Sequence, residues 1–345
     1  MHLFRRSFVN KRWRIVNACF CVFAIFWAAN ARCETVLRVG YVPILPVSQM
    51  FVMEGEGWAK KAGITLKTVR FSEGPGILQA LNANELDVAY FGIGPAMIAR
   101  SNGVDIRVVA SDVVEQVAFI ARGELAFYML RDPKAGIERF TLKKKRKPKI
   151  ATFSIGSVPD TVLRYWLTKV AKLPKDSIEI VAMGADRVQQ ALLDGSVDGA
   201  SITEPIVTLA LVKDKTAKVV VDGSDMMPNM PGAILAVRGD LMRNKPEIVQ
   251  KLVEMHNRAT EYLIMEPNRS ARHIYAAIGK GPMTLEIIER AITSPYSKFV
   301  SDPYRIIAST QVMHDFQLEI GVLRKPVPLK ELFEVKFFDK LSARQ

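Results

Sequence analysis

QALLDGSVDGA at residues 190–200 repeats QALNANELDVA at residues 79–89, and this repeat is the strongest indication of the fold in the sequence. Five of the eleven positions match without a gap, at an offset of 111 residues. Both copies contain the same sequence of signals: an amphipathic helix, a tight turn and a buried strand that begins at the shared aspartate, Asp87 or Asp198. The repeat therefore predicts one strand–helix unit that occurs in both halves of the chain.

Short apolar strands and amphipathic helices alternate on both sides of each copy. A proline, Pro95 or Pro205, follows each repeated strand and opens the next helix, where its missing N–H group is tolerated. We expect strands at residues 36–42, 64–71, 87–91, 106–110, 149–153, 178–182, 198–202, 217–221 and 233–237. This alternation predicts an α/β fold with two open, mostly parallel sheets, flanking helices and a helical C-terminal tail.

Two sheets imply two lobes. We expect residues 34–121 and 233–345 to form lobe I and residues 125–222 to form lobe II. Two crossings would join them, near residues 121–125 and 222–231, with Gly123, Gly223 and Gly232 as candidate hinge residues. Ligands of such sheets bind beyond the carboxyl ends of the strands, which here would face each other across a cleft.

The N-terminus has the layout of a secretory signal. Basic residues between positions 5 and 14 precede an apolar run at 15–29 and the small-x-small motif Ala29-Asn30-Ala31. The run is short for a membrane span, which needs roughly 20 residues, so an uncleaved anchor is the weaker alternative. We expect a cleaved signal at residues 1–31 and a periplasmic, monomeric mature protein. The Sec route is favoured, and Arg5-Arg6 leaves the Tat route open.

The composition excludes several classes of protein. The formal net charge is +13, and the signal carries five of these charges, which leaves +8. In an exported protein this charge indicates a solvated basic surface rather than a nucleic-acid partner, and we interpret the basic run at 143–147 as a solvated loop. Cys19 and Cys21 fall inside the signal, so Cys33 alone remains. We therefore expect no internal disulfide, no metal and no cofactor.

The chain resembles the periplasmic solute-binding proteins of nitrate-, sulfonate- and taurine-type ABC importers, a family that also includes binders of thiamine-precursor pyrimidines. LRVGYVP at 37–43 and FSEGPGILQALNANELDVAYFGIGPA at 71–96 carry the resemblance in the first half. PKIATFSIGSVPDTVLRYWL at 148–167 and IEIVAMGADRVQQALLDGSVDGASITEP at 178–205 carry it in the second. The resemblance implies a two-lobed binding protein that captures a small solute between its lobes and delivers it to a membrane permease.

The strongest candidate site is the loop FSIGSVPD at 153–160, where a strand ends and a helix begins. The free N–H groups and partial positive charge of a helix N-terminus suit a sulfonate, carboxylate or phosphonate group. Ser154, Gly156 and Ser157 are the candidate ligand contacts, and we expect an anionic, sulfonate-like solute. The alternative is that Ser157 or Asp160 only caps the helix.

Equivalent loops at other strand ends supply the remaining candidates. These candidate binding residues are Pro43, Pro46, Ser48, Ser72, Gly74, Gly94, Ser111, Asp112, Met183, Gly184, Thr203 and Glu204. Glu204 has three open interpretations: it holds an amine of the ligand, forms a salt bridge between the lobes, or caps the helix that begins near Ile206.

An enzyme on this fold would need a nucleophile, a base or a set of metal ligands. His256, His273 and His314 all fall in the helical tail, and no cysteine cluster accompanies them. The related pyrimidine synthase uses clustered cysteines and histidine, as the resemblance implies. We therefore expect no enzyme activity. A ligand-binding enzyme of pyrimidine metabolism and a sensor without a transporter remain the alternatives.

Overall fold

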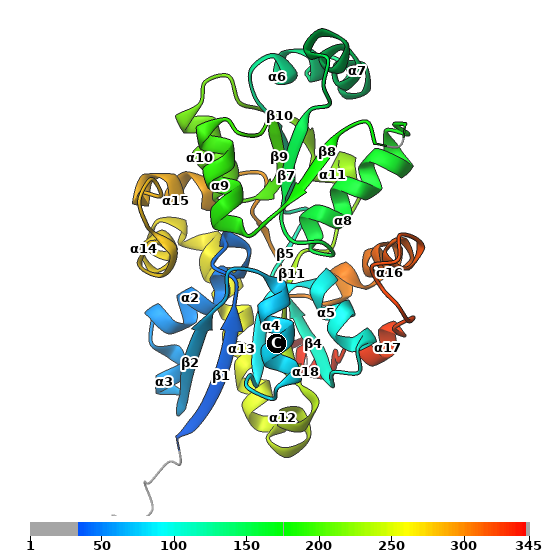
Figure 1. Ribbon diagram of the computed structural model, residues 1–345. Coiled ribbons are helices and arrows are strands. Elements are labelled where there is room, and N and C mark those ends of the chain that lie inside the picture. Colours follow the sequence, from blue (N-terminus) through cyan, green and yellow to red (C-terminus); the bar gives the residue numbers. More distant parts are fainter. Residues whose placement is uncertain (1–33, 175, 343–345) are drawn as a thin grey trace, which may run out of the picture. The chain divides into compact units, whose positions relative to one another are not determined.

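Two five-stranded sheets form the framework of the computed structural model, which describes residues 34–174 and 176–342 (Figure 1). The strand order is β2-β1-β3-β11-β4 in the first sheet and β10-β6-β9-β7-β8 in the second. The strands of the first sheet are β1 (Thr35–Tyr41), β2 (Ile64–Arg70), β3 (Val88–Gly92), β4 (Ile106–Ser111) and β11 (Ala233–Arg238). Those of the second are β6 (Val117–Ala121), β7 (Lys149–Thr152), β8 (Glu179–Ala182), β9 (Gly199–Thr203) and β10 (Lys218–Asp222). All nine predicted strands are present, within two residues at either end.

Each sheet is mostly parallel and contains one strand that runs against both of its neighbours. β11 is antiparallel to β3 and β4, whereas β1 and β3 are parallel. β6 is antiparallel to β9 and β10, whereas β7 is parallel to β8 and β9. β6 and β11 are the strands with which the chain enters each sheet after crossing from the other. The prediction of two mostly parallel sheets is confirmed, and the crossings account for the reversed strands.

The first crossing lies earlier in the chain than predicted. The predicted boundary at residue 121 placed Val117–Ala121 in lobe I, but β6 pairs with strands of the second sheet and so belongs to lobe II. All five of its residues are buried and apolar, so their pattern does not reveal which sheet they join. The chain crosses through residues 112–116, where the short strand β5 (Val113–Val114) pairs with β12 (Lys298–Phe299). It returns between β10 and β11.

Two of the three candidate hinge glycines lie at the crossings. A Cβ atom on Gly232 would collide with the carbonyl oxygen of Val113, and one on Gly223 would lie 2.5 Å from that of Val117. Close approach of the two crossing segments therefore requires glycine at both positions. Gly123 was assigned wrongly, because it begins α6 (Gly123–Met129) at the far end of β6.

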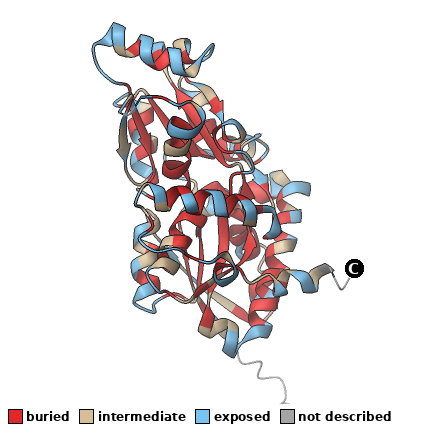
Figure 2. Ribbon diagram, turned by 90° about the vertical axis from the view of Figure 1, so that its right-hand side faces the viewer, coloured by how far each residue is buried: buried red, intermediate tan, exposed pale blue. Residues whose placement is uncertain are grey.

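Helices cover the sheets, and the buried residues concentrate in the strands and the inner faces of the helices (Figure 2). The first part of the chain contributes η1 (Leu45–Val47), α2 (Ser48–Gly55), α3 (Trp58–Lys61), α4 (Gly74–Asn82) and α5 (Ile93–Ser101) to lobe I. Lobe II carries α6, α7 (Pro133–Lys144), α8 (Val158–Tyr165), the π-helix η2 (Trp166–Val170), α9 (Ala185–Asp194) and α10 (Ile206–Lys213). α11 (Gly223–Met226) lies in the second crossing.

The C-terminal part is helical, as predicted. It comprises α12 (Gly239–Asn244), α13 (Pro246–Met265), α14 (Pro267–Ile278), α15 (Leu285–Ile292), α16 (Tyr304–Glu319), α17 (Leu329–Leu332) and α18 (Lys336–Ser342). The basic run at 143–147 is only partly a loop, because Lys143 and Lys144 form the last turn of α7.

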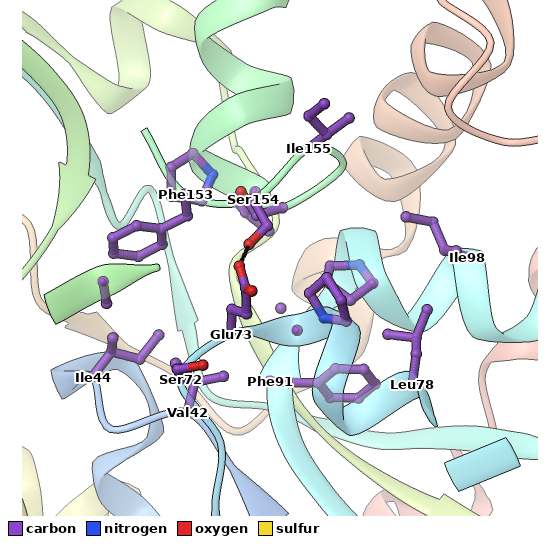
Figure 3. A pocket seen from close by; sticks show the side chains of 18 of the residues that line it. Val42, Ile44, Ser72, Glu73, Leu78, Phe91, Ile98, Phe153, Ser154 and Ile155 are labelled. Carbon is purple, nitrogen blue, oxygen red and sulfur yellow. Dashed lines mark hydrogen bonds between the residues drawn. The ribbon is translucent and has the colours of Figure 1, made fainter. Parts of the chain in front are cut away.

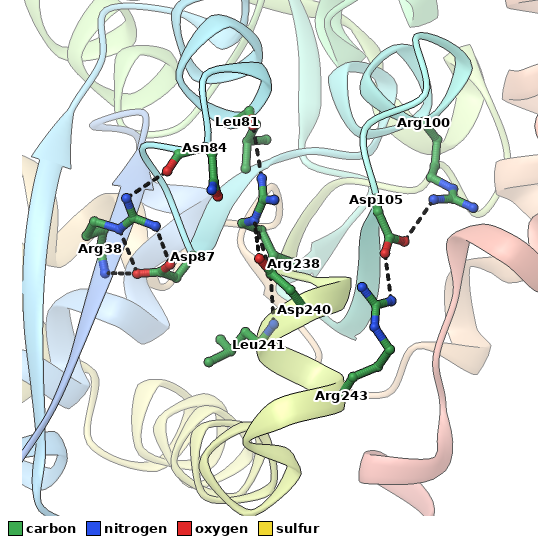
Figure 4. A network of polar contacts seen from close by, with 10 residues as sticks. All are labelled: Arg38, Leu81, Asn84, Asp87, Arg100, Asp105, Arg238, Asp240, Leu241 and Arg243. Atoms are coloured by element: carbon green, nitrogen blue, oxygen red, sulfur yellow. Dashed lines mark hydrogen bonds and ion pairs between the residues drawn. The ribbon is translucent and has the colours of Figure 1, made fainter. Parts of the chain in front are cut away.

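The repeated aspartates have the same structural role in both lobes. Asp87 accepts a hydrogen bond from the backbone N–H of Arg38 at 2.8 Å and pairs with the guanidinium of that residue (Figure 4). Asp198 accepts one from the backbone N–H of Lys149 at 2.8 Å and pairs with both terminal nitrogens of Arg146. In both lobes the aspartate thus fixes the start of one strand against its parallel neighbour. The repeated sequence therefore corresponds to this contact between two parallel strands rather than to a ligand contact.

Among the helices of the described residues, none combines the length and the hydropathy that crossing a membrane requires. The predicted signal at residues 1–31 lies outside the described part of the chain.

Candidate functional site

A cavity of about 360 Å³ lies between the lobes, and both contribute to its walls (Figure 3). Lobe I supplies the loop after β2, the exposed side of α4, the end of β3 and part of α5. Lobe II supplies the loop after β7, the start of α8 and the start of α9. The lining residues are Val42, Ile44, Ser72, Glu73, Gly74, Pro75, Leu78, Gln79, Asn82, Phe91, Gly92, Pro95, Ile98, Asn102, Gln116, Phe153, Ser154, Ile155, Ser157, Val158, Pro159 and Ala185.

The cavity is largely apolar and contains a few polar groups. Glu73 is the one ionisable residue among the lining residues named above. Its carboxylate accepts a hydrogen bond from the hydroxyl of Ser154, which joins the two lobes across the cavity. Figure 3 shows this pair close to the rings of Phe91 and Phe153. Such an arrangement suits a small organic molecule with an apolar body and at least one polar group.

The loop at residues 153–160 differs in structure from the predicted anion site. Asp160 is fully buried, accepts a hydrogen bond from the backbone N–H of Gly156 at 3.0 Å and pairs with Arg164 at 2.8 Å. Ser157 is the N-cap of α8, because its hydroxyl accepts from the N–H of Asp160. Burial raises the pKa of Asp160, and the Arg164 charge and the Gly156 N–H oppose that rise. The chain's own carboxylate therefore occupies the position proposed for an anionic ligand.

Gly156 serves the contact between the lobes. It has a φ of 82°, and its carbonyl accepts a hydrogen bond from the amide of Gln317 at 3.1 Å. Gly94 approaches it from lobe I, since a Cβ atom there would collide with the Gly156 carbonyl. The same Gln317 amide also donates to Thr161 at 2.8 Å. These two glycines were predicted as ligand contacts, but they allow the lobes to touch beside the cavity.

Glu204 caps its own helix, one of the three open interpretations. Its carboxylate accepts from the N–H of Thr208 at 2.9 Å and from the hydroxyl of the same residue at 2.8 Å. Burial raises the pKa of Glu204 to about 7, although hydrogen bonds from Thr208 and Ser294 act in the opposite direction. Its backbone carbonyl accepts from the N–H of Leu45 at 3.3 Å, so the residue also joins the lobes through the main chain.

Four predicted contacts line the cavity: Ser72, Gly74, Ser154 and Ser157. Another six are buried outside it: Pro46, Ser48, Ser111, Asp112, Thr203 and Glu204. Met183 and Gly184 follow β8, just before the lining residue Ala185, and Pro43 lines a neighbouring hollow. Most of the predicted contacts therefore lie in loops that border the cavity, whereas only four of their side chains line it.

Asp112 belongs to a buried polar cluster at the start of the first crossing. Its carboxylate lies 3.6 Å from Nε2 of His256, and that nitrogen lies 2.8 Å from the carbonyl oxygen of Ser111. Burial raises the pKa of Asp112 well above its ordinary value and lowers the pKa of His256 to about 4. His256 is therefore uncharged near neutral pH, burial disfavours the charged form of Asp112, and both side chains form part of the interior of lobe I.

Several lining residues were missed by the sequence analysis. Phe91 and Phe153 have the signature of ordinary core residues at strand ends, and Gln116 lies in the crossing that was placed elsewhere. Glu73 could have been found, because it is the one carboxylate within the Ser72–Pro75 loop.

A second hollow of about 400 Å³ adjoins the cavity and differs from it in charge. The two share Ile44 and Ala185, but the second hollow also contains Arg70, Asp186 and Lys280. Arg70 and Asp186 form an ion pair between the lobes at 3.3 Å.

Two observations concern the side chains that a catalytic site would need, namely nucleophiles, bases and metal ligands. Neither histidine nor cysteine occurs among the cavity residues named above. Across residues 34–174 and 176–342, no group of three or more His, Cys, Asp or Glu side chains has an arrangement that could hold a metal ion.

Known proteins resemble the chain over most of its length. A putative aliphatic sulfonates-binding protein of Bacillus subtilis (strain 168) is 26% identical over 310 residues, which cover 88% of this chain and 87% of that protein. The periplasmic nitrate-binding protein NrtA from Synechocystis PCC 6803 has a TM-score of 0.76 at 12% identity, covering 90% of this chain and 89% of its own. The alkanesulfonate-binding protein SsuA from Xanthomonas axonopodis pv. citri, bound to MOPS, has a TM-score of 0.69 at 20% identity and covers 87% and 98%.

The two solved structures confirm the predicted periplasmic binding-protein fold, and the predicted resemblance to nitrate-, sulfonate- and taurine-type binding proteins is confirmed as well. Residues 31–278, well over half of the sequence, match the NMT1-like family. The chain therefore belongs to the NMT1-like family.

Proposed function

We propose that the protein is the periplasmic solute-binding component of an ABC importer. It captures a small molecule in the cavity between its lobes and delivers it to a membrane permease. The observation that carries this proposal is the cavity itself, whose walls come from both lobes at the ends of the strands. Two relatives named as binding proteins support it: the putative aliphatic sulfonates-binding protein, matched over 87% of its length, and a taurine-binding periplasmic protein of Escherichia coli (strain K12), matched over 61%.

The arrangement of the lobes supports capture by closure. Glu73 and Ser154 meet across the cavity, and Gly94 and Gln317 contact Gly156 beside it. A solute that touches both walls binds the closed form more tightly than the open form, and this difference in affinity shifts the equilibrium toward closure. The crossings at Gly223 and Gly232 are the segments that would absorb the movement.

Mass spectrometry tests capture directly. The mature protein is incubated with a small-molecule extract of its host, separated from unbound compounds and denatured, and the released compound is identified. We refer to this compound as the retained solute. Leu78→Trp fills the cavity and should abolish retention. Leu66→Trp is the matched control, because Leu66 is also half-buried but lies on β2 outside the cavity. Equal retention by both variants would contradict binding in the cavity.

A further inference from the structure

The charges around the cavity oppose the binding of an anion. Glu73 contributes a carboxylate, and the other polar lining groups are the neutral side chains of Ser72, Gln79, Asn82, Asn102, Gln116, Ser154 and Ser157. No lysine, arginine or histidine is present among the lining residues given above. A buried or half-buried anion needs a partner charge or several hydrogen-bond donors, and a carboxylate beside it raises its energy.

The nearby arginine side chains already form ion pairs with aspartates of the chain itself. Arg164 pairs with Asp160 at 2.8 Å, and Arg70 pairs with Asp186 at 3.3 Å on the side of the second hollow. The N-terminus of α8 would be the remaining anion site of the loop. Its Gly156 N–H, however, donates to Asp160, and the cap hydroxyl of Ser157 accepts from the Asp160 N–H. An incoming anion would have to displace the buried carboxylate of Asp160.

The walls favour an apolar body. Val42, Ile44, Leu78, Phe91 and Phe153 present aliphatic and aromatic side chains to the cavity (Figure 3). Ile98 and Ile155 extend this surface on the side of α5 and α8. Such walls stabilise a hydrocarbon or aromatic portion in proportion to the apolar area that leaves water. They offer no compensation for a small, strongly hydrated ion.

We propose that the solute is a small, non-anionic molecule with an apolar or aromatic body and an amino or other hydrogen-bond-donating group that binds Glu73. This inference rests on the proposed function, because it assigns a chemical class to the ligand of the same cavity. Glu73 is the specificity-determining residue. Its carboxylate accepts hydrogen bonds only, so it selects a donor and rejects a sulfonate or a carboxylate.

A latch between the lobes is the other role that Glu73 could have, since its present partner is the hydroxyl of Ser154. The variant Glu73→Gln distinguishes the two roles. Glutamine keeps the size of the side chain and a carbonyl oxygen that accepts from Ser154, but it removes the charge. A latch would survive the substitution, whereas the affinity for a solute with a cationic amino group would weaken because the negative charge is lost.

Three probes with the same carbon skeleton test the inference: 2-phenylethylamine, 2-phenylethanol and 2-phenylethanesulfonate, titrated calorimetrically into the mature protein. We expect the amine to bind most tightly and the sulfonate at least tenfold more weakly, because a hydrogen bond to a charged group has about this effect on affinity. Glu73→Gln should weaken amine binding about tenfold, whereas Glu85→Gln, an exposed carboxylate outside the cavity, should not. A sulfonate that binds as tightly as the amine, or an amine affinity unchanged in Glu73→Gln, would overturn the inference.

The identity of the retained solute decides the same question if the cavity accepts none of these probes. An amine, or a neutral compound with donor groups, supports the inference. A retained sulfonate, carboxylate or nitrate overturns it and leaves the proposed function intact. If no compound is retained, the proposed function fails and the inference fails with it.

Discussion

Replacing Ser157 with alanine separates the two roles that a serine at the start of a helix can have. Its hydroxyl accepts a hydrogen bond of 3.3 Å from the N–H of Asp160 and caps α8. Loss of such a cap destabilises a protein by about 1 kcal/mol. In a chain of this size that change lowers the melting temperature by roughly 1–2 °C. We expect Ser157→Ala to show this fall in calorimetry without solute and to keep its affinity for the retained solute.

Ser154→Ala is the matched control, because Ser154 lies three residues away in the same loop and caps no helix. Its hydroxyl donates to Glu73 in the cavity wall. We expect the opposite pattern: a nearly unchanged melting temperature without solute and an altered affinity. If Ser157→Ala instead weakened binding about tenfold at an unchanged melting temperature, Ser157 would be a ligand contact and the cap interpretation would be refuted.

Three further predictions concern stability and movement. The pKa of Glu204 is raised to about 7 in the folded protein, so the folded state binds the proton of this carboxyl more tightly than the unfolded state does. The free energy of unfolding should therefore fall as the pH rises from about 4.5 to about 7. Urea unfolding across this range should show a shallower fall for Glu204→Gln than for the unchanged protein, and parallel pH dependences of the two proteins would contradict the assignment. Asp87→Ala and Asp198→Ala should each lower the free energy of unfolding by about 1.5–3 kcal/mol, because each removes charge-assisted hydrogen bonds at equivalent strand–strand contacts. A large effect of one substitution and none of the other would show that the two contacts are not equivalent. Saturation with the retained solute should reduce the radius of gyration in small-angle X-ray scattering, whereas an unchanged radius would exclude closure.

The sequence predicted the fold because the features that define it are local and occur twice. Asp87 and Asp198 each join two parallel strands. The turn before each aspartate holds a residue with a positive φ, 59° at Asn84 and 79° at Gly195. Asparagine and glycine tolerate that conformation, so the turns were recognisable from residue type. Residues 117–121, which form β6, were not predicted as a strand and were placed in the wrong lobe, because a fully buried strand has no polar face to indicate its neighbours.

The site was harder to predict because its character depends on side chains far apart in the sequence. The N-terminus of α8 looked ready for an anion, and only the fold shows that Asp160 turns back to Gly156 and pairs with Arg164. Glu73 becomes the charge of the cavity only because Ser154, 81 residues later, faces it across the lobes. Local motifs identify strand ends, but they do not show which charges a neighbouring element already neutralises.

A crystal structure of the protein with its retained solute would show where the solute binds and which of its groups contacts Glu73. We predict density for the solute in the cavity between Phe91 and Phe153, in contact with both lobes and with a donor group at Glu73. Density for an anion in the adjoining hollow, beside Arg70 and Lys280 and with the cavity empty, would contradict both the site and the chemical class of the solute.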